Sequence, residues 1–130
     1  MRVMQPASEP CADRLIVACL CAQWCSVCRQ WKAGFDNLAM QFPQASWIWV
    51  DVEDKVEVLG DFEPDNFPVL AVQRGAHLVF CATLPQQTGI WQRLIEELGA
   101  LDQTQALKQA ERLRRTSAVP LDLRQLTSGL

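Results

Sequence analysis

The chain alternates between short apolar runs and longer amphipathic stretches. Leu15–Cys21 is an almost continuous apolar run, which is typical of a central strand buried on both faces. From Ser26 to Gln41 the apolar residues recur at helical spacing, and Pro43 marks the end of this segment. Ser46–Val52 alternates and is rich in aromatic and branched residues, so it predicts a second strand, parallel to the first and joined to it by the helix.

The second half of the chain shows two more strand patterns and two helix patterns. Phe67–Val72 predicts a third strand, and Arg74–Ala76 predicts the turn of a hairpin whose partner strand is His77–Ala82. A helical period runs from Ile90 to Leu98, and another covers Asp102–Thr116. Strands alternating with helices indicate an α/β fold.

Composition and length are those of one globular domain. The chain has 130 residues, of which 49% are hydrophobic and 21% charged. Residues 1–13 are polar and contain two prolines, so we expect an N-terminal arm. Residues 14–99 would form the domain, and residues 100–130 a C-terminal helical extension and tail. The extension could pack on the domain, mediate self-association or dock on an acidic partner.

Charge and hydropathy argue against two classes of partner. The net charge of −3 does not suit a general nucleic-acid binder, for which a clustered basic surface is expected. No apolar run is long enough to span a bilayer. The opening segment also lacks the apolar core of a secretory signal, so we expect a cytoplasmic location.

The chain has six cysteines, which in a reducing compartment would stay thiols unless they are catalytic. Cys19, Cys21 and Cys81 lie in strand-like apolar runs. We expect these three to be small buried hydrophobic residues.

Cys25 and Cys28 stand where the first predicted strand meets the first predicted helix. The first turn of a helix exposes unpaired N–H groups and the positive end of the helix dipole, which favour a thiolate. Cys25 would be the exposed, attacking nucleophile. Cys28 is three residues on, on the same helical face, where it can attack a mixed disulfide and release the partner. This chemistry needs no cofactor and no metal.

The segment Trp24-Cys25-Ser26-Val27-Cys28, placed after a hydrophobic strand, resembles the W-C-x-x-C motif of the thioredoxin family, and Phe67-Pro68 resembles its cis-proline loop. The resemblance covers roughly Leu15 to Leu98. It implies a thioredoxin-like fold, with a central mixed four-stranded sheet flanked by helices, N-terminally trimmed and extended by a C-terminal helix.

The same resemblance implies a thiol–disulfide oxidoreductase. Cys25 and Cys28 would reduce disulfides in protein partners, become oxidised to a disulfide, and be recycled by an external reductase. The docking surface for a partner would be a small apolar area around the sulfur, formed by Trp24, Val27, Phe67 and Pro68.

Three features depart from the family pattern. Ser26-Val27 replaces the common Gly-Pro pair between the cysteines, which affects the reduction potential and the direction of the reaction. Cys19 occupies the position at which many members carry a buried acid as a proton shuttle. The segment before Leu15 leaves little room for the family's N-terminal strand and helix.

Two other functions fit parts of the pattern. Cys19, Cys21, Cys25 and Cys28 could be read as a zinc cluster, but two of the four lie inside a strand that the core needs, and an extended strand keeps Cys19 far from Cys25. The chain could instead be a thioredoxin-fold interaction or assembly module without redox turnover, because a fold does not settle a function.

Overall fold

The computed structural model describes residues 15–22, 25–54, 66–117 and 121–127. Within these ranges four strands form one sheet in the order β2-β1-β3-β4. Their bounds are β1 (Leu15–Cys21), β2 (Ser46–Asp51), β3 (Val69–Arg74) and β4 (His77–Thr83). β1 runs parallel to β2 and antiparallel to β3, and β3 and β4 form an antiparallel hairpin. The prediction of a mixed four-stranded sheet is confirmed.

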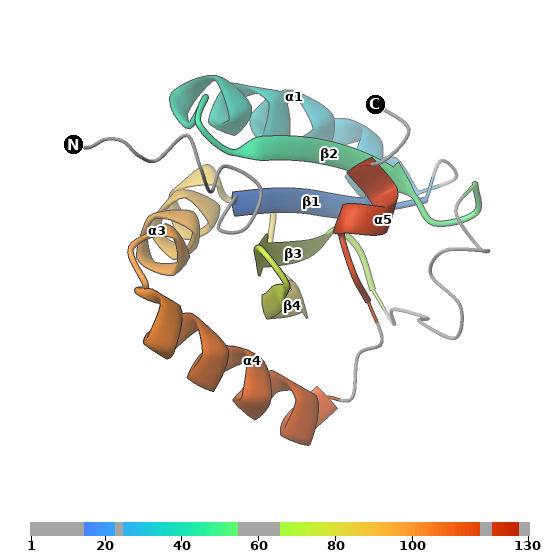
Figure 1. Cartoon of the computed structure of the whole chain (residues 1–130). Helices are drawn as coiled ribbons and strands as arrows, with labels where there is room; N and C mark the ends of the chain where they lie inside the picture. The colour runs from blue at the N-terminus through green and yellow to red at the C-terminus, as the bar shows by residue number, and fades with distance from the viewer. Residues whose placement is uncertain (1–14, 23–24, 55–65, 118–120, 128–130) are drawn as a thin grey trace.

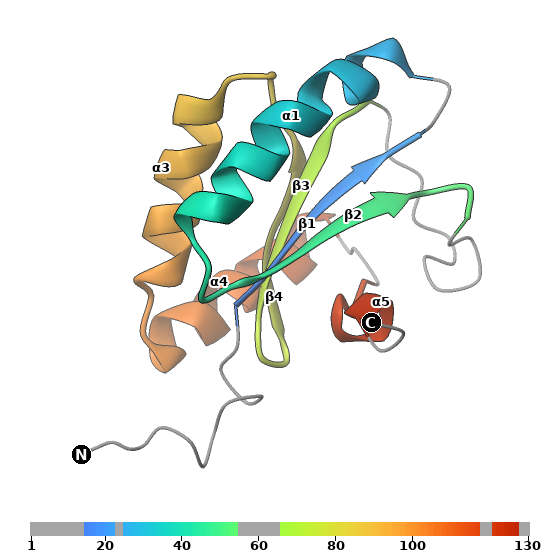
Figure 2. The ribbon, with the colours of Figure 1, turned by 90° about the horizontal axis from the view of Figure 1, so that it is seen from above.

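The described helices are α1 (Ser26–Gln41), α3 (Thr88–Gly99), α4 (Gln103–Ser117) and the short α5 (Arg124–Thr127). α1 and α3 lie across the same face of the sheet (Figures 1 and 2). Two details differ from the sequence prediction: β3 begins at Val69, after the Phe67-Pro68 pair, and α5 was not predicted. Pro68 lacks the N–H that a ladder position requires, which explains why the strand starts after it. The predicted arm, residues 1–13, lies outside the described residues.

The core under α1 and α3 follows from the alternation of side chains along the strands. Val17, Cys19 and Cys21 of β1 point to this face. They are covered mainly by Trp31, Phe35 and Leu38 of α1 and by Trp91, Ile95 and Leu98 of α3. The rings of Trp31 and Trp91 are tilted against each other, with centroids 4.8 Å apart. This aromatic layer holds α1 at a fixed position above the carboxyl end of β1.

The opposite face of the sheet is covered in part by the C-terminal segment. Ile16, Ala18 and Leu20 of β1 point to this face, and they share a buried cluster with Leu121, Leu123 and Leu126. The apolar run of β1 is therefore buried on both sides, as its sequence predicts.

The buried side chain of Gln73 holds the C-terminal segment to β3. Its amide nitrogen donates to the carbonyl of Gly75 at 2.9 Å and to the carboxylate of Asp122 at 2.8 Å, and its oxygen accepts from the N–H of Leu123 at 2.6 Å. These bonds satisfy a polar group that would otherwise be costly to bury.

α4 lies beside the edge strand β4, with Ala106 and Ala110 buried. A guanidinium nitrogen of Arg74 donates to the carbonyl of Leu101, which links the sheet to the start of the extension. Covering an edge strand with a helix protects its unpaired backbone groups. None of the described helices is long and apolar enough to cross a membrane.

Candidate active site

The turn between β1 and α1 places Cys25 immediately before the first turn of α1. The N–H of Cys25 donates to the carbonyl of Ala22 at 3.0 Å, and the carbonyl of Cys25 accepts from the N–H of Arg29 at 3.3 Å. Cys25 is the N-cap residue, with extended backbone angles, and α1 begins at Ser26. Its thiol is free and partly exposed. The predicted position of Cys25 at the helix entrance is therefore what the structure shows.

Cys28 lies in the first turn of α1, on the face that packs against the sheet, and its side chain is 1% exposed. It forms a disulfide with Cys21, the last residue of β1, and the two Cα atoms are 5.7 Å apart. The expected Cys25–Cys28 pairing is thus not the one in this structure. The expectation that Cys21 is only a small hydrophobic residue was wrong. Cys21 points to the face that α1 covers, directly toward the buried side of α1.

A fourth sulfur lies beside the disulfide. The Sγ atoms of Cys19 and Cys21 are 3.8 Å apart, and Cys19 is fully buried with a free thiol. Burial raises the pKa of the Cys19 thiol far above its ordinary value, and the nearby charge of Lys32 lowers that pKa by a smaller amount. Cys19 is therefore a protonated thiol at neutral pH. Cys81, on β4, is a partly buried free thiol whose pKa is raised by burial to about 11.

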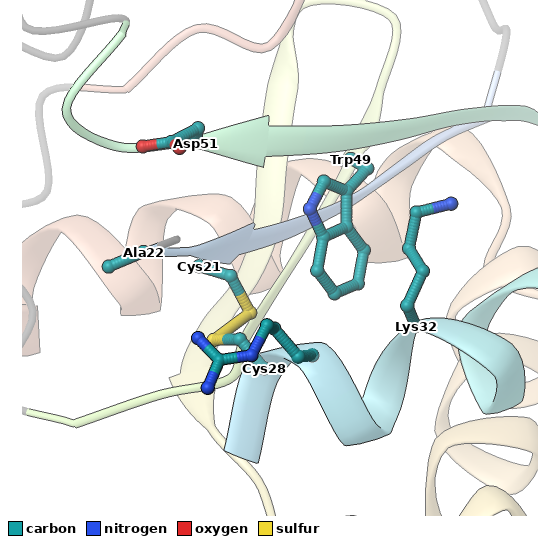
Figure 3. A pocket seen from close by; sticks show the side chains of 7 residues that line it. Cys21, Ala22, Cys28, Lys32, Trp49 and Asp51 are labelled. Atoms are coloured by element: carbon teal, nitrogen blue, oxygen red, sulfur yellow. A yellow bond between two sulfur atoms is a disulfide. The ribbon is translucent and has the colours of Figure 1, made fainter. Parts of the chain in front are cut away.

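A cavity of about 500 Å³ opens beside the disulfide at the carboxyl ends of β1 and β2. It is lined by Cys21, Ala22, Cys28, Arg29, Lys32, Trp49 and Asp51. Figure 3 shows the disulfide bridging the end of β1 and the start of α1, with Trp49 and Lys32 alongside. The Nζ atom of Lys32 lies 5.4 Å from the centre of the Trp49 ring and 2.9 Å from a carboxylate oxygen of Asp36. The lining of the cavity thus combines the two disulfide cysteines with two basic residues, Arg29 and Lys32, and one acidic residue, Asp51.

The sequence prediction did not include Cys21 or the other residues that line this cavity among the site residues. Asp51 could have been placed there, because it ends the strand parallel to β1 and pairs with Cys21 in register. The side-chain direction of Cys21 was also readable, because Cys21 has the same parity as Val17 and Cys19 along β1. The distance between β1 and α1 could not be predicted from the sequence, and this distance decides whether Cys21 and Cys28 can form a disulfide.

The predicted docking surface is described only in part. Val27 and Phe67 are partly exposed, Pro68 is buried, and Trp24 lies outside the described residues. The Phe67-Pro68 peptide bond is cis, as the family resemblance implies. The carbonyl of Pro68 accepts from the N–H of Leu84 at 3.2 Å, so the loop is tied to the segment after β4. The docking role of these residues stays a prediction.

The zinc alternative finds no support in the described part of the chain. Among those residues no group of three or more histidine, cysteine, aspartate or glutamate side chains could hold a metal ion. The bond between Cys21 and Cys28 also occupies two of the four thiols that such a site would need.

Comparisons with known proteins agree on the fold. No family model matches the chain. Human thioredoxin is 30% identical over 64 residues, which is 49% of this chain and 61% of that protein, so the match spans less than two thirds of the relative. The thioredoxin of Fasciola hepatica has a TM-score of 0.60 at 23% identity and covers 69% of this chain and 85% of its own. The germline-specific thioredoxin Deadhead of Drosophila melanogaster has a TM-score of 0.60 at 19% identity, with 71% and 88% covered.

The two kinds of similarity carry different weight. The solved structures, at these identities, establish the thioredoxin fold. The sequence match to human thioredoxin adds homology over about half of the chain. Together, these comparisons show that the chain has the thioredoxin fold and that about half of its sequence is similar to human thioredoxin.

Proposed function

We propose that the chain is a thiol–disulfide oxidoreductase that reduces disulfides in protein partners. The observation that carries this proposal is the free, partly exposed thiol of Cys25 at the N-terminus of α1, one helical turn before Cys28, whose sulfur is held in a disulfide. Because this thiol is partly exposed, a disulfide of a partner protein can reach it. The described first turn of α1 has no acidic side chain.

The reaction starts from the fully reduced site. The Cys25 thiolate attacks one sulfur of the partner's disulfide, and the other partner sulfur leaves as a thiolate. Cys28 then attacks the Cys25 sulfur of the mixed disulfide, and the second partner sulfur leaves. Two electrons pass to the partner, and Cys25 and Cys28 are left as a disulfide.

An external dithiol or reductase must return the two electrons after each cycle. It must also open the Cys21–Cys28 disulfide before Cys28 can act. A reducing compartment such as the cytoplasm would suit this cycle, and the free thiols of Cys19 and Cys81 are compatible with one. Val27, Phe67 and Pro68, together with Trp24, are the proposed contacts for the partner protein, and self-association through α4 remains a separate proposal.

The test is reduction of a protein disulfide, such as that of insulin, with dithiothreitol as the electron source. We expect Cys25→Ser to reduce the catalysed rate to the uncatalysed level. In a parallel sample from which the dithiothreitol has been removed, reduced Cys28→Ser should form a mixed disulfide with the substrate that persists. Cys81→Ser is the matched control, because Cys81 is a free, partly buried thiol on β4 outside the sulfur cluster, and it should keep the wild-type rate. Catalysis that survives in a folded Cys25→Ser protein would overturn the proposal.

A second function is favoured by one specific observation. The Cys21–Cys28 bond withholds the resolving thiol from Cys25, and a chain permanently in this state would bind partners without redox turnover. Such an interaction module would show no insulin reduction in any variant. It would still bind its partner after Cys25→Ser, whereas an oxidoreductase would lose its mixed disulfide.

A further inference from the structure

Three cysteines around the start of α1 compete for one disulfide. Cys28 is bonded to Cys21, and Cys25 is a free thiol. A Cys25–Cys28 bond would represent the same loss of two electrons. The two pairings are therefore isomers of one oxidation state, related by an internal thiol–disulfide exchange.

The local geometry makes Cys28 the shared partner. Cys25 is the N-cap residue and Cys28 lies in the following turn, and the N–H of Cys25 donates to the carbonyl of Ala22, just after the end of β1. On its other side, Cys28 already meets Cys21 within bonding distance. Cys28 is thus bonded to a buried cysteine of β1 and lies one helical turn after a partly exposed one.

Cys21 is inaccessible to a protein partner. Its side chain is 1% exposed, whereas Cys25 is partly exposed. An incoming protein disulfide can therefore meet Cys25 but not Cys21. Any redox role of Cys21 has to pass through Cys28.

We propose that Cys21 is a third redox-active cysteine, which exchanges with Cys25 for the bond to Cys28. This inference rests on the proposed oxidoreductase function. The Cys21 thiolate attacks the Cys28 sulfur of a Cys25–Cys28 disulfide, the Cys21–Cys28 bond forms, and Cys25 leaves as a thiolate at the N-terminus of α1. The proton that Cys21 gives up goes to Cys25 or to water. No oxidant or reductant is consumed.

The exchange changes what the site can do. With Cys28 bonded to Cys21, Cys25 is still a nucleophile but has no resolving thiol. A mixed disulfide formed on Cys25 then persists until an outside thiol cleaves it. The position of the internal disulfide thereby selects between rapid turnover and prolonged covalent capture of a partner.

Cys19 is not a fourth member of this exchange. Its sulfur is 3.8 Å from that of Cys21, but it is fully buried and carries a free thiol beside the formed disulfide. The residue that Cys28 meets within bonding distance is Cys21, the last residue of β1, whereas Cys19 keeps its thiol. Cys19 is therefore the matched control for Cys21, with the same residue type, strand and face two positions earlier.

The experiment maps the disulfide isomers in the full chain. Reduced protein is oxidised in a glutathione buffer, the oxidant is removed, and samples are acid-quenched over time. Free thiols are then alkylated, the disulfides are reduced, and the newly released thiols receive a second label. Cleavage after Arg14 and Arg29 leaves Cys19, Cys21, Cys25 and Cys28 in one peptide, so tandem mass spectrometry has to place each label.

We expect Cys28 to carry the second label in every singly oxidised molecule, with the other label shared between Cys25 and Cys21. The ratio of the two should change with time while the total stays at one disulfide per molecule. In Cys21→Ser the Cys25–Cys28 isomer should be the only one, and the fraction of oxidised molecules with a free Cys25 should fall to background. Cys19→Ala should behave as the wild type.

Two results would overturn the inference. One is a wild-type protein that forms only Cys25–Cys28. The other is a Cys21–Cys28 bond that never converts, which would be a static structural disulfide. Insulin reduction by the same samples separates this inference from the proposed function. Wild-type turnover with only a Cys25–Cys28 disulfide overturns the role of Cys21 alone, whereas absence of turnover in fully reduced protein overturns the oxidoreductase function.

Discussion

Side-chain direction decides the partner of Cys28. Cys25 is nearer in sequence, and its spacing from Cys28 suggests a dithiol pair on one helix face. Cys21 belongs to the strand, and its side chain points to the face on which α1 packs. Once the aromatic layer fixes α1 over β1, Cys21 and Cys28 come within bonding distance. Cys25–Cys28 and Cys21–Cys28 are therefore both pairings between residues close in sequence, and the structure contains the buried Cys21–Cys28 bond.

Cys19 occupies the strand position next to the disulfide, so replacing it with an acid tests whether the site lacks a proton acceptor. We expect Cys19→Asp to accelerate disulfide reduction near neutral pH, because a carboxylate beside the buried sulfurs can accept the proton of the resolving thiol. The measurement is the initial rate of insulin reduction as a function of pH. Cys19→Asn is the control of matched size, and it should show no acceleration. An equal rate in folded Cys19→Asp and Cys19→Asn proteins would contradict this role.

Cys81 should react with alkylating agents much more slowly than Cys25 at neutral pH. Burial raises the pKa of the Cys81 thiol to about 11, and only the thiolate reacts. Because a raised pKa keeps the thiol protonated, the Cys81 rate should rise about tenfold for each pH unit and level off near pH 11. Mapped iodoacetamide labelling between pH 6 and 10 checks that the Cys81 rate is still rising at the upper end of this range. A Cys81 rate that already levels off near pH 8.5 would show an ordinary thiol.

At the scale of elements, the position of α1 depends on a close contact between Gly34 and the ring of Trp31 within the same helix. A Cβ atom added at Gly34 would lie 2.7 Å from Cζ3 of the Trp31 ring. Trp31 cannot easily move aside, because its ring is buried against Trp91. Gly34, a residue type of low helix propensity, therefore makes room for the tryptophan that holds α1 on the sheet.

Gly34→Ala should destabilise the protein despite the better helix propensity of alanine. The propensity gain is about 1 kcal/mol, whereas overpacking of a filled core costs about 1–3 kcal/mol. Gly89→Ala in α3 is the matched control, because a Cβ there meets no described atom within 4 Å, and it should be neutral or stabilising. Chemical denaturation of both variants provides the free energies of unfolding. A Gly34→Ala protein more stable than wild type would show that the Trp31 ring can yield.

At the scale of the whole molecule, the C-terminal extension is part of the fold. Leu121, Leu123 and Leu126 bury the face of the sheet opposite α1 and α3, and α4 lies along the edge strand β4. Figure 2 shows α5 apart from the α1 and α3 layer, beyond β2. The predicted boundary at residue 99 therefore separates segments that share a core.

Leu123→Ala should lower the free energy of unfolding by about 2–5 kcal/mol, because it empties a fully buried position. Leu107→Ala on α4 is the control, since Leu107 is 40% exposed and should cost about 0.5 kcal/mol or less. Urea unfolding followed by tryptophan fluorescence measures both. A loss of about 0.5 kcal/mol or less for Leu123→Ala as well would contradict the proposed contribution of this leucine to the second core.

Much of the fold could be predicted from local patterns. The apolar run of β1, the helical period of α1 and the hairpin of β3 and β4 each depend on residues close in the chain, so their types and most of their bounds agree with the structure. α5 could not be predicted in this way, because a helix of this length forms through tertiary packing rather than its own propensity. The placement of Cys25 at the start of α1 was equally local.

The sequence by itself determined the order of strands and helices along the chain and the position of Cys25 and Cys28 at the start of α1. Only the tertiary structure decided that Cys28 bonds to Cys21 and that the C-terminal leucines complete the second core. The physical reason is the same in both cases. Periodicity reports which face of an element is buried, but the partner on that face depends on how separate elements approach in space. That approach is set by packing of the whole core.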